Sequence, residues 1–330
     1  MENLRSKPLI EGAILTAIVV VLMIIANMPG LFIIGNILVP IPVAILYIKH
    51  KWKISILSVI VGFIIVSFLL GPISGINAAL FSGFVGLPLG YGIRARRTGT
   101  VTLLYMVIGS VSTFIVSTAI TIYITMGTTL TAFLNSRLAQ YKEIANTVIK
   151  SAPNEQSVEA IKHLMSFWTV NNLKLGMPLV LVVIGFIASI IIYNIARNIM
   201  LKLKLKVEPL KSFSQWYISP KAIAIIIAIA VLGIELKKNG VPFGKEIFGG
   251  TWGILFILFV LQGLSLLAYF VTKKLKANRI VIVVIFILLI TSGMFIYLIP
   301  IGLVDVILDY RNLDEHSLGS FIKRKLDPKQ

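Results

Sequence analysis

The residues with the most evident capacity for chemistry are the few ionisable side chains that interrupt long apolar stretches. Asp305 and Asp309 are four residues apart in such a stretch, so a helix would place both carboxylates on one face. Two carboxylates there could bind a cation or relay protons, and charged groups inside a membrane are costly enough to mark functional positions. The alternative, which we favour, is that they lie at the membrane interface and pair with Arg311 or with basic loops.

Glu11 is the acidic residue of the first apolar stretch, residues 9–28. It follows Pro8 at the beginning of the expected helix, where a carboxylate also suits the positive end of the helix dipole. A structural role and a functional role are equally compatible with this position.

Uncharged polar residues inside the apolar stretches are a second group of candidates. Asn36 and Asn77 could line a cavity in the outer half of the protein, and we predict that they bind substrate together with Ser74 and Ser82. The alternative is that such amides bond across helices, which stabilises a membrane bundle by about 1 kcal/mol each. The other amides in this class are Asn27, Asn194 and Gln262.

The sequence lacks signatures of catalysis and of metal binding. It has no HExxH motif and no P-loop, and the Ser-Gly pairs at Ser74 and Ser82 lack the flanking pattern of a nucleophile elbow. There is no cysteine, and the three histidines, His50, His163 and His316, are widely separated. We therefore predict that the protein is not an enzyme and holds no metal and no cofactor.

The composition is that of a membrane protein. Hydrophobic residues make up 57% of the 330-residue chain and charged residues 13%, with a mean hydropathy of +0.95. The net charge of +18 comes from basic residues that flank the apolar stretches, and most of these residues fall at the ends that would lie on one side of a membrane. This asymmetry predicts that those ends face the cytoplasm and the anionic lipid headgroups. The lipid bilayer is thus the expected partner, and nucleic acid is not.

These features predict an all-α polytopic transmembrane bundle of about 8–10 spans in the cell (plasma) membrane, with a cytoplasmic N-terminus. The last apolar stretch is too long for one upright span; a hairpin is favoured because it returns the basic tail to the cytoplasm. Residues 127–174 form the largest polar excursion, expected outside as two amphipathic helices broken at Pro153, with Asn154 as an N-cap. The expected spans are 9–28, 31–48, 54–70, 71–97, 100–126, 175–200, 221–236, 250–271 and one or two in 280–309.

A stripe of small residues runs along the span expected at residues 71–97. Six of them fall within an arc of about 120° on one helix. Such a stripe lets helices approach closely in lipid, and this packing role is favoured over a groove for substrate. The six residues are Gly71, Gly75, Ala79, Gly83, Gly86 and Gly90.

Motifs in the second half are more specific than hydropathy. They are Phe213-x-x-Trp216-x-x-x-Pro220, Gln262-Gly263-Leu264 and Gly302-x-x-Asp305-x-x-x-Asp309-Tyr310-Arg311. In this order they resemble the YybS-like family of bacterial membrane proteins, a family of unknown function that is distantly similar to the substrate-binding S components of energy-coupling-factor (ECF) transporters. The resemblance implies an S-component-like six-helix domain over residues 1–206, including the outer hairpin 127–174, and a C-terminal membrane block over residues 207–330.

The same resemblance implies a partner. In S components a small-residue motif on the first span docks the coupling subunit, and Ala13-x-x-x-Ala17 matches that pattern beside Gly12 and Thr16. The extra C-terminal spans and the long outer hairpin depart from the S-component pattern and put docking on a shared module in question.

The sequence thus favours a transport-related protein that binds a small molecule from the outer side, with an ECF-type coupling subunit and ATPases as candidate partners. The ligand pocket would be lined by residues 71–97 and closed by residues 127–174. The alternative is a non-transporting scaffold or regulator that recruits partners through the basic cytoplasmic face formed by residues 197–221 and the tail to residue 330.

Overall fold

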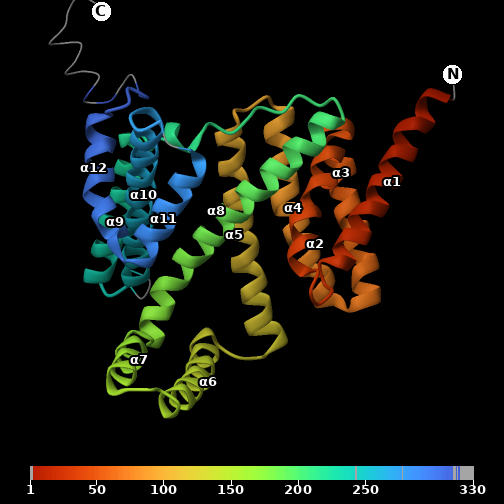
Figure 1. Cartoon of the computed structure of the whole chain (residues 1–330). Coiled ribbons are helices and arrows are strands. Elements are labelled where there is room, and N and C mark those ends of the chain that lie inside the picture. The colour runs from red at the N-terminus through yellow and green to blue at the C-terminus, as the bar shows by residue number, and fades with distance from the viewer. Residues whose placement is uncertain (1–2, 242–243, 277, 315–316, 318, 320–330) are drawn as a thin grey trace, which may run out of the picture. The chain divides into compact units, whose positions relative to one another are not determined.

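The computed structural model describes residues 3–241, 244–276, 278–314, 317 and 319, which form helices and no β-strand (Figure 1). A linker of residues 203–219 separates the helices of the first part from those of the second, and short 3-10 turns occupy Phe213–Gln215 and Met294–Tyr297. The helices are α1 (Asn3–Ile25), α2 (Phe32–Leu38), α3 (Pro40–Leu70), α4 (Pro72–Arg94), α5 (Gly99–Ala119, continued by the π-helical turn Ile120–Thr125), α6 (Leu130–Lys150), α7 (Glu155–Phe167), α8 (Val170–Lys202), α9 (Pro220–Lys238), α10 (Gly244–Lys273), α11 (Arg279–Thr291) and α12 (Leu298–Leu308).

Several of these helices are long and apolar enough to cross a membrane. The described segments that meet this test are Phe32–Leu70, Pro72–Arg94, Gly99–Thr125, Val170–Lys202 and Gly244–Lys273, with shorter apolar helices at Ile10–Ile25 and Met294–Leu308. Phe32–Leu70 has 39 residues, about twice what one crossing needs. The backbone of α3 breaks at Lys51 (φ 69°, ψ 172°), which separates residues 40–50 from residues 52–70. The predicted all-α polytopic bundle is confirmed.

The chain forms two compact units. Unit 1 comprises Met1–Leu173 and Val180–Leu210, and unit 2 comprises Lys174–Leu179 and Lys211–Gln330. The division after Leu210 falls in the linker between α8 and α9.

In unit 1, the small residues of α4 lie against both halves of α3. A Cβ on Gly75 would meet Ser67 and the carbonyl of Phe63, and Gly83 lies near Val59. Further along α4, a Cβ on Gly86 would meet Val43 and one on Gly90 would meet Tyr47. The stripe therefore allows backbone-to-backbone packing of α4 on α3, as small residues do in lipid.

Gly71 does not belong to this helical stripe. It has φ 92° and ψ 157°, and it lies between the last residue of α3 and Pro72, the first residue of α4. A positive φ of this kind is open to glycine at little cost. The prediction that all six small residues lie on one helix is wrong at this position, because Gly71 makes the turn that reverses the chain.

Pro88 gives α4 a second contact, on the side of α5. Proline has no N–H, so the carbonyl of Phe84 four residues earlier loses its helical partner. Gly109 of α5 packs directly on that carbonyl, and a Cβ there would collide with it. The pair Pro88 and Gly109 thus sets the close approach of α4 and α5.

Residues 127–174 contain the two predicted helices, α6 and α7, on either side of Pro153. The side chain of Asn154 accepts a hydrogen bond from the Ser157 N–H at 2.8 Å and caps α7. Leu134 and Leu138 of α6 are buried, whereas no residue of α7 is. Ring contact between Tyr141 and Trp168, with centroids 5.5 Å apart, joins residues on either side of the Pro153 break.

In unit 2, α10 packs against both α9 and α12. Two glycines bring α10 and α12 into backbone contact: a Cβ on Gly263 would collide with the carbonyl of Leu298, and one on Gly302 with the carbonyl of Phe259. The last apolar stretch contains two helices, α11 and α12, separated at Gly293 (φ 73°), as the predicted hairpin requires.

Candidate functional site

A cavity of about 470 Å³ lies among the helices of unit 1. Its walls come from the end of α1, from α2, and from α4, α5 and α8. Most of the lining is aliphatic or aromatic, and none of the described lining residues is ionisable. The lining residues are Ala26, Asn27, Phe32, Ile33, Asn36, Ile37, Asn77, Ala78, Phe81, Thr113, Phe114, Ser117, Ile184, Ile187, Ala188, Ile191 and Ile192.

One buried polar atom of this cavity has no hydrogen-bond partner among the described residues. The Oδ1 atom of Asn77 is buried and accepts no hydrogen bond from any residue that the structure describes. By contrast, the amide of Asn27 donates to the carbonyl of Met23, and that of Asn36 to the carbonyl of Phe32, both at 2.9 Å. Because a buried polar group without a partner costs about 1–3 kcal/mol, Asn77 is the lining residue that gains most from a ligand.

The cavity lies toward the end of unit 1 that is opposite the Arg94–Arg97 turn. Asn77 is in the second turn of α4, which ends at Arg94. The short helix α2, which contributes lining residues, lies at the same end (Figure 1).

The predicted substrate residues divide into two pairs. Asn36 and Asn77 both line the cavity, although they are 41 positions apart in the sequence. Ser74 is not among the lining residues, and Ser82 is fully buried, with its hydroxyl donating to the carbonyl of Ala79 in its own helix at 3.1 Å. No described lining residue belongs to residues 127–174, so the expected closure by this segment is not part of the structure.

The apolar residues that line the cavity could not be identified from the sequence. Phe81, Phe114 and Ile187 look like ordinary core positions, because hydropathy does not distinguish a residue that faces a cavity from one that faces a neighbouring helix. The sequence offers no signal for α8 as a wall, since its lining residues form one continuous apolar run with the rest of the span.

The small residues of α1 lie on two different faces of the helix. Gly12 is buried near Ile54 of α3, and the hydroxyl of Thr16 donates to the Gly12 carbonyl at 2.8 Å. Ala13 and Ala17 are exposed. The Ala13-x-x-x-Ala17 pattern therefore lies on a face of α1 that no described residue covers.

Glu11 joins α1 to α3. Its carboxylate pairs with the ammonium group of Lys49, and its second oxygen lies 3.4 Å from the Nε2 atom of His50. The pairing gives Glu11 a structural role at the beginning of α1.

A second polar site, in unit 2, gathers the motif residues. The guanidinium of Arg311 donates from Nη2 to Asp305 Oδ2 at 2.7 Å, and both side chains are fully buried. The ion pair expected between the C-terminal acidic residues and Arg311 is thus present for Asp305. Arg311 also donates to the carbonyls of Ser214 and Trp216, at 2.7 and 2.9 Å.

Gln262 and Ser265 of α10 complete this network. The amide of Gln262 donates to Asp305 Oδ2 at 2.7 Å and accepts from the Ile218 N–H at 3.0 Å. The hydroxyl of Ser265 lies 2.6 Å from Arg311 Nη1 and within hydrogen-bond distance of the carbonyls of Phe213 and Trp216. These contacts hold residues 213–218 against α10 and α12.

Other motif residues shape the surroundings of this network. The Trp216 indole donates to the carbonyl of Lys211 at 2.9 Å. Pro220 occupies the first turn of α9, with Ser219 as its N-cap. Asp309 ends α12 in a left-handed conformation, and its Oδ2 accepts from the Asp314 N–H at 2.8 Å. Asp309 thus caps a helix and does not pair with Arg311 in the way that Asp305 does.

Tyr217 lies beside these carboxylates in the linker that precedes α9. Burial raises the pKa of its phenol, and the negative charge of Asp309 raises that pKa further. The hydroxyl therefore stays protonated at neutral pH and donates to the carbonyl of Val306 at 2.9 Å.

Most of the amide side chains considered in the sequence do not bond across helices, which differs from the expectation. Asn27, Asn36 and Asn194 each donate to a carbonyl four residues earlier in the chain. Gln262 is the amide that joins different elements, because its side chain is long enough to reach both the linker and α12.

Comparison with known proteins agrees with the membrane architecture. The protein is similar to the "Uncharacterized protein YybS" of Bacillus subtilis (strain 168), with 23% identity over 290 residues that cover 85% of this chain and 90% of the relative. No solved structure matches the chain. A model of the family described as "Predicted membrane protein (DUF2232)" matches residues 16–306. This range includes all residues that line the cavity and, from the polar network in unit 2, Gln262, Ser265 and Asp305. The chain therefore belongs to this DUF2232 family of membrane proteins.

Proposed function

We propose that this membrane protein has a transport-related role and binds a small molecule in the cavity of unit 1. The observation that carries the proposal is the buried Asn77 Oδ1, an acceptor on the wall of a cavity of about 470 Å³ that has no hydrogen-bond partner in the described part of the chain. Cavities of about 300–1,000 Å³ with a few polar groups on apolar walls are typical of small-molecule sites.

The chemistry of the wall restricts the ligand. The described lining residues carry no charge, so a charged ligand would lose its hydration without gaining an ion pair. The ligand is therefore uncharged and largely apolar, with an N–H or O–H group that donates to Asn77.

The direction of entry follows from the positive-inside rule. The basic residues of Arg94–Arg97 mark the cytoplasmic end of α4, so the cavity opens in the outer half of a plasma-membrane protein whose N-terminus is cytoplasmic. The sequence contains no ATP-binding motif, and any active transport takes its energy from a partner or an ion gradient. The exposed Ala13–Ala17 face of α1 is where a coupling subunit would dock.

Asn77→Leu is expected to weaken ligand binding about tenfold or more, because it removes the acceptor and fills part of the cavity. The ligand is first found by thermal-shift screening of the purified full-length protein against uncharged vitamins, nucleobases and terpenoid alcohols. Its affinity for the variant is then measured by titration calorimetry.

The matched control is Asn194→Leu, because Asn194 is an exposed amide on α8 that bonds to its own helix and lies outside the cavity lining. It should bind the ligand with unchanged affinity. Equal losses in the two variants, or the absence of any stabilising compound in the uncharged set, would count against the cavity as the binding site.

A further inference from the structure

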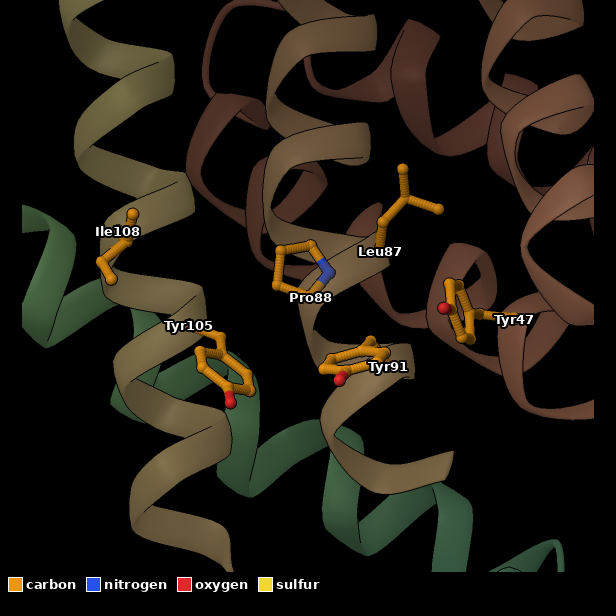
Figure 2. A pocket seen from close by; sticks show the side chains of 6 residues that line it. All are labelled: Tyr47, Leu87, Pro88, Tyr91, Tyr105 and Ile108. Carbon is orange, nitrogen blue, oxygen red and sulfur yellow. The ribbon is translucent and has the colours of Figure 1, made fainter. Parts of the chain in front are cut away.

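A groove of about 410 Å³ lies on another side of unit 1, between the first half of α3, α4 and α5. Figure 2 shows Tyr47, Tyr91 and Tyr105, one from each helix, with Leu87, Pro88 and Ile108 beside them. The ring centroids of Tyr47 and Tyr91 are 6.4 Å apart, and those of Tyr91 and Tyr105 are 5.9 Å apart. We call this feature the tyrosine groove.

The tyrosine groove is graded from polar to apolar along the helices. Tyr91 is three residues before Arg94, the end of α4, whereas Leu87 and Pro88 lie about one turn deeper in the bundle. In Figure 2 the hydroxyl oxygens of Tyr91 and Tyr105 point away from Leu87 and Ile108. Tyrosine prefers this depth, where its ring meets acyl chains and its hydroxyl meets headgroups.

The apolar floor is open to the surroundings of the bundle. Ile108 is 58% exposed, and its neighbour Leu104 on α5 is 56% exposed. In a polytopic protein such a surface continues the hydrocarbon-facing side of the span, so the groove is reached from the lipid and needs no opening in the bundle.

Positive charge surrounds the polar end. Arg94 is held in place, because its guanidinium donates to the carbonyls of Tyr47 and Ile48 at 3.0 and 3.2 Å. Arg96 and Arg97 follow in the exposed turn, and neither forms an ion pair within the described part of the chain. The sequence has no acidic residue between Glu11 and Glu143, and Glu11 already pairs with Lys49. Glu208 is the acidic residue nearest to this turn along the packed linker, because its neighbour Pro209 contacts Gly99, but it forms no ion pair with Arg96 or Arg97 among the described residues. The two guanidinium groups are therefore available to an external anion.

We propose that the tyrosine groove binds an anionic phospholipid of the leaflet at the Arg94–Arg97 end. One acyl chain lies on Leu87, Pro88 and Ile108. The hydroxyls of Tyr91 and Tyr105 donate to the glycerol-phosphate region, and Arg96 and Arg97 pair with the phosphate and the anionic headgroup. A phospholipid fits because the groove joins a hydrocarbon floor, a hydroxyl layer and a cationic rim in the order in which a lipid presents its own parts.

The first test is native mass spectrometry of the delipidated full-length protein in detergent, titrated with dioleoyl phosphatidylglycerol or with dioleoyl phosphatidylcholine. The wild type should retain phosphatidylglycerol at least tenfold more tightly. Arg96→Gln with Arg97→Gln should lower that affinity about fivefold for each arginine removed, because each cation near the surface contributes to anionic-lipid binding. The matched control, Lys237→Gln with Lys238→Gln, removes two exposed cations far along the chain from the groove and should change nothing.

A second pair of substitutions tests the hydroxyl layer. Tyr91→Phe with Tyr105→Phe keeps the rings and the fold, and it should lower phosphatidylglycerol affinity about tenfold through the loss of hydrogen bonds to a charged group. Equal retention of the two lipids, an unchanged affinity in both double variants, or full competition by soluble glycerol phosphate at equal concentration would each overturn the proposal.

Discussion

Replacing Arg311 with alanine is expected to lower the free energy of unfolding of unit 2 by about 3–5 kcal/mol, because it leaves a buried carboxylate without its cation. Asp305 is fully buried and would keep only the Gln262 amide as a hydrogen-bond donor among the described residues. The carbonyls of Ser214 and Trp216 would each lose the hydrogen bond that Arg311 donates, although the Ser265 hydroxyl would remain near the Trp216 carbonyl. The apparent melting temperature should fall on the order of 10 °C.

Tryptophan fluorescence of the full-length protein in detergent measures this change. Trp216 and Trp252 report on unit 2, once Trp52 and Trp168 of unit 1 are replaced by phenylalanine. Arg96→Ala removes an exposed arginine and should leave the melting temperature within about 1 °C, since exposed charges contribute little.

The double variant Asp305→Leu with Arg311→Met separates the ion pair from simple loss of packing. Replacing both partners by apolar residues removes the unpaired charge and should recover part of the stability that Arg311→Ala loses. If the double variant is less stable than Arg311→Ala, or if Arg311→Ala behaves like Arg96→Ala, the buried pair is not what holds unit 2 together.

The architecture could be predicted from the sequence because a membrane imposes few solutions. Apolar stretches of the right length must be helices, and basic clusters such as Arg94, Arg96 and Arg97 mark their ends. The Asp305–Arg311 pair could be anticipated for the same reason, since a charge in an apolar helix needs a partner. The other partners of Arg311 could not, because they are backbone carbonyls of Ser214 and Trp216 and no side-chain type encodes them.

The cavity was only partly predictable. Asn36 and Asn77 stand out as amides in apolar helices, and both line it. Ser82 stands out equally in the sequence, but its hydroxyl donates a hydrogen bond to a carbonyl of its own helix. A serine bonded in this way needs no partner from a ligand or from a neighbouring helix. Gly71 fits the spacing of the small-residue stripe as well as Gly75 does, yet it forms the turn; spacing along the chain does not reveal where a helix ends.

Substituting alanine for Gly302 is expected to separate α10 from α12 and to lower the free energy of unfolding by about 3 kcal/mol or more. The added Cβ would collide with the carbonyl of Phe259, and backbone cannot move aside as a flexible side chain can. Asp305 is one turn further along α12, so the same shift would draw its carboxylate away from Gln262. The loss should therefore exceed that of ordinary overpacking, and it is measured by the same melting experiment.

Gly250→Ala is the matched control for this substitution. Gly250 lies in α10 itself, and an added Cβ would meet no atom within 4 Å, so alanine should stabilise the helix by up to about 1 kcal/mol through its higher helix propensity.

Because Gly302→Ala and Asp305→Asn both act on the contact of α12 with Gln262, their combined effect on the free energy of unfolding should be smaller than the sum of the two single effects. If the two losses in the free energy of unfolding were strictly additive, the glycine contact and the polar network would stabilise unit 2 independently. If Gly302→Ala destabilises unit 2 while Gly250→Ala stabilises it, position 302 requires glycine for the close approach of the backbones and not for backbone flexibility.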